Sequence, residues 1–219
     1  MSVDIEGNLA MYLGERHPTA RYTSFDYCFN YFRGAYEDGR VAEIAFGSNL
    51  ERSCLHLGFY LASWGMLRGS SPLLSKSVKH YVPVVEVVAS APPDVWTIDA
   101  HAYTDSAIGT VMDVRSQLRA AFPDASSDIL ITKIMLGVFG CVPAFDGQFK
   151  KGFGVWSFGS KELRAISDFY AANAEVIERH RVPTLDFESG EPTQRKYTRA
   201  KVIDMIFFIE GSPRRSSSG

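Results

Sequence analysis

The apolar positions follow a helical spacing most clearly after residue 48. Ser48-Asn49-Leu50-Glu51 is a capping box, whose Ser and Glu side chains bond free N–H groups at a helix start. Apolar residues then recur at three- and four-residue intervals and form one stripe: Leu50, Cys54, Leu57, Leu61 and Trp64. A second apolar face holds Leu55, Phe59, Ala62 and Met66. The sequence therefore predicts a central helix, which ends in the turn formers Arg68-Gly69-Ser70-Ser71-Pro72.

Similar spacing predicts helices along the rest of the chain. They cover residues 23–33, 106–122, 128–138 and 160–179, and a last helix follows Thr198. Ser and Thr residues at their starts are typical N-caps: Thr23, Ser127, Ser160 and Thr198. Residues 73–81 are also compatible with a helix, whereas residues 1–18 are mixed and are expected to be irregular.

Only two runs have the composition of strands. Residues 82–88 are rich in Val and fit either a strand or a helix with Pro83 in its first turn, and residues 155–158 form the other run. The sequence therefore predicts an all-α fold. We expect one helical domain over residues 1–210, with no internal repeat or linker, and a disordered Ser/Arg/Gly-rich tail over residues 211–219.

The composition is that of an ordinary globular protein, with 46% hydrophobic and 22% charged residues among 219. The three cysteines are widely spaced and odd in number, which argues against a disulfide framework, a zinc site or an iron–sulfur cluster. We therefore expect no metal and no cofactor. The first eight residues include Asp4 and Glu6, unlike a signal peptide, and no run reaches the ~18 apolar residues of a membrane span. These features predict a cytoplasmic protein that has no membrane partner.

The formal net charge of −2 argues mildly against a nucleic-acid partner, since phosphate binding usually leaves a basic surface. Charge is nevertheless uneven along the chain. Basic residues gather in the second half, at Lys150, Lys151, Arg195, Lys196, Arg199 and Lys201. Most of these are expected to be solvated surface charges.

Candidate chemistry is concentrated in residues 132–149. An apolar helix that carries Lys133 runs into two glycines, Pro143 then fixes the chain, and Asp146 opens the next element. A carboxylate at such a position can accept hydrogen bonds from the free N–H groups of a helix start. The simpler interpretation of Asp146 is therefore an N-cap, because caps are common and catalytic carboxylates are rare.

The order of these residues resembles the helix-hairpin-helix superfamily of DNA glycosylases. In many members, a helix with a Lys near its start leads through a short turn to a Pro-x-x-Asp or a Val-x-Asp, and this Asp is catalytic at a helix N-terminus. The matching residues here are Lys133 and Val142-Pro143-Ala144-Phe145-Asp146. The resemblance covers residues 48–149 in order and pattern, and it implies the all-helical fold of the superfamily.

The chain departs from the family pattern in three places. The Leu-Pro-Gly-x-Gly hairpin motif is replaced by Leu136-Gly137-Val138-Phe139-Gly140, and the iron–sulfur cysteines of some members are absent. Bifunctional members carry a Schiff-base Lys further ahead of the Asp than Lys133 is. The resemblance therefore implies a monofunctional enzyme, in which Lys133 faces solvent or a DNA phosphate.

The resemblance assigns roles to two segments. Asp146 would stabilise an oxocarbenium-like state at C1′ of a flipped nucleotide and position or deprotonate water. The end of the helix after Ser48 and its loop would supply the wedge and part of the base pocket, from Trp64, Met66, Arg68, Ser70 and Ser71. Contacts to the DNA backbone would come from Lys133, Gly137, Gly140, Lys150, Lys151 and Arg199.

The wedge residues also have simpler interpretations. Trp64 lies on the apolar stripe and fits the core. Arg68 can neutralise the C-terminus of a helix, and Ser70 with Ser71 fits an ordinary turn.

The implied activity is that of a monomeric, cofactor-free DNA glycosylase that removes a modified base from double-stranded DNA and leaves an abasic site. A glucosylated hydroxymethylcytosine in phage DNA is one candidate substrate, which would give a role in phage defence, and an alkylated or deaminated base is the alternative. A non-enzymatic helical domain that binds a protein or a nucleic acid is the second hypothesis. It is favoured by the aromatic residues that crowd residues 25–36 and by the small net charge.

Overall fold

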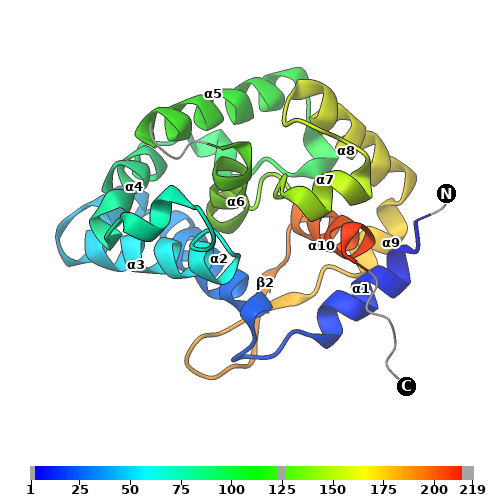
Figure 1. Ribbon diagram of the computed structural model, residues 1–219, viewed down its shortest axis with the longest axis horizontal. Coiled ribbons are helices and arrows are strands. Elements are labelled where there is room, and N and C mark those ends of the chain that lie inside the picture. The colour runs from blue at the N-terminus through cyan, green and yellow to red at the C-terminus, as the bar shows by residue number, and fades with distance from the viewer. Residues whose placement is uncertain (1–2, 123–126, 214–219) are drawn as a thin grey trace.

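The computed structural model describes residues 3–122 and 127–213. Within them the chain is mostly helical, which confirms the prediction of a helical fold class (Figure 1). The helices are α1 (Ile5–Gly14), α2 (Ser24–Glu37), α3 (Gly47–Ser63), α4 (Val82–Ala89), α5 (Asp105–Ala121), α6 (Asp128–Phe139), α7 (Gly147–Phe153), α8 (Ser160–Ala172), α9 (Ala174–Arg179) and α10 (Arg199–Gly211). Two short strands, β1 (Pro183–Leu185) and β2 (Pro192–Lys196), pair antiparallel. In this described part, no helix combines the length and the apolar character that crossing a membrane requires.

Helices α6, α7 and α10 lie in the middle of the fold, and the other helices surround them (Figure 1). Every residue of α6 from Leu130 to Phe139 is buried, because this helix is apolar on nearly all sides. It packs against α2, α3 and α5, whereas α10 packs against α7 and α1. The segment that joins α6 to α7 contains Asp146. This residue therefore lies where the helices that pack around α6 meet the helices that pack around α10.

Helices α7 and α10 approach each other closely at glycines. A Cβ at Gly211 would lie 1.9 Å from the carbonyl oxygen of Gln148, and a Cβ at Gly152 would lie 2.3 Å from the carbonyl oxygen of Phe207. Gly211 is a buried residue of α10, whereas the sequence predicts a disordered tail from this position onward. The predicted start of the tail is therefore too early, and residues 214–219 lie outside the described residues.

Gly211→Ala is expected to lower the free energy of unfolding by about 1–3 kcal/mol, because the backbones of α7 and α10 must separate to admit a methyl group. The control is Gly109→Ala, since Gly109 lies inside α5 and no atom comes within 4 Å of its Cβ position. The helix propensity of Ala should leave that variant unchanged or more stable by up to about 1 kcal/mol. Urea denaturation measures both, and equal stability of the two variants would contradict the close packing.

Several predicted boundaries differ from the structure. Residues 1–18 contain α1, which Asp4 caps by accepting a hydrogen bond from the Gly7 N–H at 3.0 Å. The predicted helix over residues 160–179 breaks at Asn173 into α8 and α9. Of the two strand-like runs, Val82–Ala89 is helical and residues 155–158 contain no strand.

Two of the predicted N-caps act through their side chains. Ser127 accepts a hydrogen bond from the Leu130 N–H and Thr198 accepts one from the Lys201 N–H, each at 3.2 Å. Thr23 makes no such bond, and α3 and α8 begin without a side-chain cap. The stripe of apolar residues, rather than its capping box, therefore places α3.

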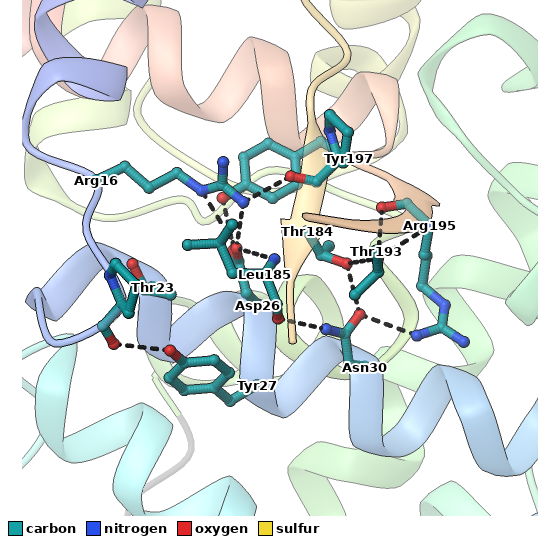
Figure 2. A network of polar contacts seen from close by, with 12 residues as sticks. Arg16, Thr23, Asp26, Tyr27, Asn30, Thr184, Leu185, Thr193, Arg195 and Tyr197 are labelled. Carbon is teal, nitrogen blue, oxygen red and sulfur yellow. Dashed lines mark hydrogen bonds and ion pairs between the residues drawn. The ribbon is translucent and has the colours of Figure 1, made fainter. Parts of the chain in front are cut away.

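The hairpin of β1 and β2 is attached to α2 by a network of polar groups (Figure 2). Asp26 is fully buried and accepts hydrogen bonds from Arg16 at 2.6 Å and from the Tyr197 hydroxyl at 2.5 Å. It also accepts one from the Leu185 N–H at 2.8 Å, while Asn30 donates to the Leu185 carbonyl at 2.9 Å. Burial raises the pKa of Asp26, and the guanidinium of Arg16 opposes that rise. Both backbone groups of Leu185 are thus fixed, which holds the hairpin in place.

Candidate functional site

Asp146 is positioned by the turn that follows α6. The chain runs back along this helix, because the Phe145 N–H donates a hydrogen bond to Thr132 Oγ1 at 2.9 Å. One residue earlier, the Ala144 N–H donates to Asp204 Oδ1 on α10 at 3.0 Å. Two buried side chains from different helices therefore fix the backbone just before Asp146.

Asp146 is the N-cap of α7, as the simpler interpretation of the sequence predicts. Its Oδ1 accepts hydrogen bonds from the N–H groups of Gln148 and Phe149, each at 3.0 Å. Its Oδ2 faces the other way and lies 3.4 Å from Lys133 Nζ. The Asp146 side chain is 12% exposed, so the carboxylate is nearly buried but not sealed from the surface.

Lys133 is buried, which corrects the expectation that it faces solvent or a phosphate. Its side chain is 6% exposed, and its Nζ donates a hydrogen bond to the carbonyl oxygen of Trp64 at 2.7 Å. Burial lowers the pKa of Lys133, Asp146 raises it, and the nearby charge of Arg68 lowers it further. A buried cation with a perturbed pKa and a specific carboxylate partner is typical of functional sites.

A second ion pair lies deeper and supports the turn. Lys201 Nζ is 2.9 Å from Asp204 Oδ2 and donates a hydrogen bond to the Tyr12 hydroxyl at 2.9 Å. Nζ also lies 4.5–4.8 Å from the centroids of three aromatic rings. Burial raises the pKa of Asp204, Lys201 lowers it, and the charge of Asp146 raises it. Because Asp204 also holds the Ala144 N–H, this pair helps to position Asp146.

Comparison with known proteins assigns no family to the chain. No family model, no curated protein and no solved structure matches it. The interpretation of the site therefore depends on its own geometry and on the order of residues 133–146.

Trp64 belongs to the core, which corrects its proposed role as a wedge. It is the C-cap of α3, is 5% exposed, and stacks with the ring of Tyr22 at a centroid distance of 5.9 Å. Its buried Nε1 has no hydrogen-bond partner among the described residues. Trp64 contacts the site through its carbonyl group, which accepts the hydrogen bond from Lys133. Its place on the apolar stripe indicates this position correctly.

The rest of the predicted wedge segment is a loop over the site. Ser71 Oγ donates a hydrogen bond to the Met66 carbonyl at 2.5 Å, so Ser71 acts as a turn residue. Met66 is half-buried, whereas Ser70 and Arg68 are exposed. A Cβ at Gly65 would lie 3.0 Å from the guanidinium carbon of Arg68, which therefore folds back over the loop. Arg68 and Ser70 are the predicted residues that a ligand can reach here.

Two glycines do not offer the N–H groups that the resemblance assigns to them. Gly137 lies inside α6, where helical hydrogen bonds use the backbone, and a Cβ there would lie 2.4 Å from the Tyr60 ring. The Gly140 N–H donates to the carbonyls of Met135 and Leu136, each at 3.0 Å. The predicted phosphate contacts of these N–H groups are therefore wrong, and the glycines serve packing and the end of α6.

The other predicted backbone-contacting residues lie in two places. Lys150 and Lys151 are in the last turn of α7, on the same helix that Asp146 caps. Arg199 starts α10, where its guanidinium lies 3.3 Å from Asp99 and 2.5 Å from Glu178. Arg199 is thus held in a network of ion pairs, whereas the two lysines lie on the helix that Asp146 caps.

Three cavities stand out in the described part of the chain, and Asp146 lines none of these three. The largest, of about 490 Å³, lies between α2, α3 and the hairpin. The second, of about 290 Å³, lies at the start of α10 and includes Arg199. The loop of residues 64–71 lines neither of these two cavities.

Proposed function

We propose that the chain is a monofunctional DNA glycosylase, which hydrolyses the N-glycosidic bond of a modified base flipped out of double-stranded DNA. The observation that supports this proposal is the pair of Lys133 and Asp146. One oxygen of the carboxylate is fixed by backbone N–H groups, and the other lies beside a buried ammonium group. The same two residues carry the resemblance to helix-hairpin-helix glycosylases.

In the proposed reaction, the bond between C1′ and the base nitrogen breaks and its electron pair leaves with the base. The sugar then carries positive charge, which the carboxylate of Asp146 stabilises. A water molecule adds to C1′ and passes a proton to Asp146, and the departing base takes up a proton from solvent. Lys133 acts by positioning Asp146, since its Nζ lies 3.4 Å from the carboxylate oxygen that the backbone N–H groups leave free.

The proposal requires the loop of residues 64–71 to move when a nucleotide enters, because Lys133 is bonded to the Trp64 carbonyl and the Lys133 and Asp146 side chains are only 6% and 12% exposed. Lids of this kind commonly close over a reacting bond and exclude water. Within the proposal, a hypermodified cytosine such as a glucosylated hydroxymethylcytosine in phage DNA is the first substrate to test, and an alkylated or deaminated base is the second.

The direct test incubates the protein with duplexes that each carry one modified base and then detects abasic sites by alkaline cleavage. We expect one substrate to yield strand breaks only after alkali, as a monofunctional enzyme would give. The matched control is the unmodified duplex of the same sequence. If no modified base in the panel is released, the glycosylase proposal fails.

Lys133 is expected not to form a covalent imine with the product sugar. Bifunctional members carry their Schiff-base Lys further ahead of the Asp, and Lys133 Nζ is already held by the Trp64 carbonyl and by Asp146. Borohydride reduction during turnover should therefore trap no protein–DNA adduct. An adduct that disappears in Lys133→Ala would show that the enzyme is bifunctional.

DNA binding is expected to depend on salt in spite of the net charge of −2. Each phosphate contact should add roughly one unit to the slope of log affinity against log salt. The candidate contacts are Arg68, Lys150, Lys151, Arg195, Lys196 and Arg199. Arg68→Glu should weaken binding and excision most, because Arg68 lies on the loop over the site. Lys151→Glu should weaken binding without changing which base is removed.

The control for these charge reversals is Lys161→Glu, an exposed change on α8 that should leave the slope unaltered. Binding is measured across a salt series with a matched duplex and a duplex that carries the modified base. A flat salt response without affinity for either duplex would contradict the glycosylase proposal.

One observation favours the second hypothesis, a helical binding domain without catalytic activity. Asp146 is satisfied as an N-cap and lies outside the three cavities, whereas the cavity between α2, α3 and the hairpin has exposed apolar walls. This hypothesis predicts ligand binding at that cavity in the absence of any base release.

A further inference from the structure

The cavity between α2, α3 and the hairpin has large apolar side chains exposed on its walls. It measures about 490 Å³, within the range of pockets that hold small ligands. Leu55 and Phe59 on α3 and Phe187 in the β1–β2 turn line it, and they are 52%, 70% and 73% exposed. Three large apolar side chains left in water at one cavity mark a binding site rather than a random surface feature.

The charged residues that line this cavity have a single sign. Arg21 and Arg52 line it, and its lining contains no Asp or Glu. Among the described residues, neither guanidinium is in an ion pair with a carboxylate. His56 adds a ring that stacks on Tyr31 at a centroid distance of 4.2 Å. The cavity therefore offers apolar surface together with two arginines that are available to an anion.

The walls are held in place before any ligand arrives. Tyr27 donates a hydrogen bond to the Pro18 carbonyl at 2.7 Å, and its ring meets Phe187 edge-on at a centroid distance of 5.1 Å. The bonds to both backbone groups of Leu185, two residues before Phe187, fix the start of the turn that carries this ring (Figure 2). A preformed site loses little entropy when it binds.

We propose that this cavity binds a nucleotide, with its base against Phe59, Leu55 and Phe187 and its phosphate on Arg21 and Arg52. Aromatic side chains beside cationic ones are the combination that binds unpaired nucleotides, since every base has a stacking face and every phosphate a charge. The hydroxyls of Ser24 and Ser63 and the His56 ring line the same cavity and can bond a base edge. The nucleotide is either free or part of a single DNA strand. Asp146 does not line this cavity, so the inference does not depend on the proposed glycosylase activity.

The test is calorimetric titration of the full chain with thymidine monophosphate, thymidine, inorganic phosphate and a four-residue thymidine oligonucleotide. We expect thymidine monophosphate to bind at least about tenfold more tightly than thymidine or phosphate alone, because neither fragment engages both the rings and the arginines. The oligonucleotide separates the two sources. Tighter binding than the mononucleotide assigns the cavity to a DNA strand, and equal or weaker binding assigns it to a free nucleotide.

Two exposed substitutions locate the binding. Phe59→Ala should weaken it at least about fivefold, which corresponds to the loss of one stacked base, and Arg52→Gln should weaken it for the phosphate-bearing ligands but not for thymidine. The matched controls are Phe46→Ala, at a Phe that is 71% exposed and lies outside the cavity, and Arg164→Gln on α8. Neither control should alter binding.

Absence of binding by both the mononucleotide and the oligonucleotide overturns the inference. So does binding that Phe59→Ala and Arg52→Gln leave unchanged, because the ligand then lies elsewhere. Asp146→Asn should bind thymidine monophosphate like the unaltered chain. A failed glycosylase proposal would appear as missing base release with this binding intact, so the two failures are distinguishable.

Discussion

Asp146→Asn is expected to lower base excision at least about a hundredfold while the protein stays folded. The amide keeps the size of the carboxylate, and its oxygen can still accept hydrogen bonds from the N–H groups of Gln148 and Phe149. It carries no charge, so it cannot balance the positive sugar, and loss of one such electrostatic contact commonly lowers turnover by about 10²–10³. The amide also no longer forms an ion pair with Lys133.

The measurement is single-turnover release of the modified base, together with thermal denaturation of each variant. Asp4→Asn is the matched control, because Asp4 also caps a helix by accepting an N–H, from Gly7 at 3.0 Å, and it has no lysine partner in the described chain. That variant should excise at the unaltered rate. Turnover of Asp146→Asn close to that of Asp4→Asn would remove Asp146 from the mechanism.

The sequence predicts the central helices well, since their apolar residues recur on nearly all sides. The stripe from Leu50 to Trp64 places α3, and the apolar run after Ser127 places α6. It does not predict the hairpin, because the side chains of β2 alternate between exposed and half-buried and none is buried. Contacts from α2 hold the hairpin instead, through Asp26 and Asn30, and such tertiary contacts leave no local pattern.

In the candidate site, too, local structure could be predicted from the sequence and tertiary contacts could not. The Pro143 turn identifies Asp146 as a capping residue, which depends on local geometry alone. The sequence does not reveal that Lys133 is buried beside a carboxylate. Its partner Asp146 lies 13 positions later, and no local pattern around Lys133 distinguishes this contact from an exposed lysine. The predictions from sequence do not include the pair of Lys201 and Asp204, although two opposite charges three positions apart in an apolar helix are a signal for a buried ion pair.

Lys201→Met is expected to lower the free energy of unfolding by about 3–5 kcal/mol, the usual effect of removing one partner of a buried ion pair. The carboxyl group of Asp204 would lose its cation in a fully buried site, where the Ala144 N–H is its one remaining donor among the described residues. The double variant Lys201→Met with Asp204→Leu should recover part of this loss, because two apolar side chains replace two charges. Recovery should be incomplete, since the Ala144 N–H loses its acceptor.

The pH dependence of the stability of Lys201→Met tests whether the unpaired carboxylate of Asp204 causes the loss. Burial raises the folded-state pKa of Asp204 above its unfolded value, and Lys201 is the group that opposes this rise most. Without Lys201 the folded pKa rises further, so the folded state favours the neutral acid, and stability is lost as pH rises through that pKa. Urea denaturation should therefore show a larger loss in the free energy of unfolding for Lys201→Met at pH 8 than at pH 5.

The control is Arg164→Ala, which breaks an exposed 2.7 Å pair with Asp105 and should change the free energy of unfolding by less than about 1 kcal/mol at both pH values. A Lys201→Met variant no less stable than Arg164→Ala, with no dependence on pH, would show that the Lys201–Asp204 pair does not support the turn before Asp146.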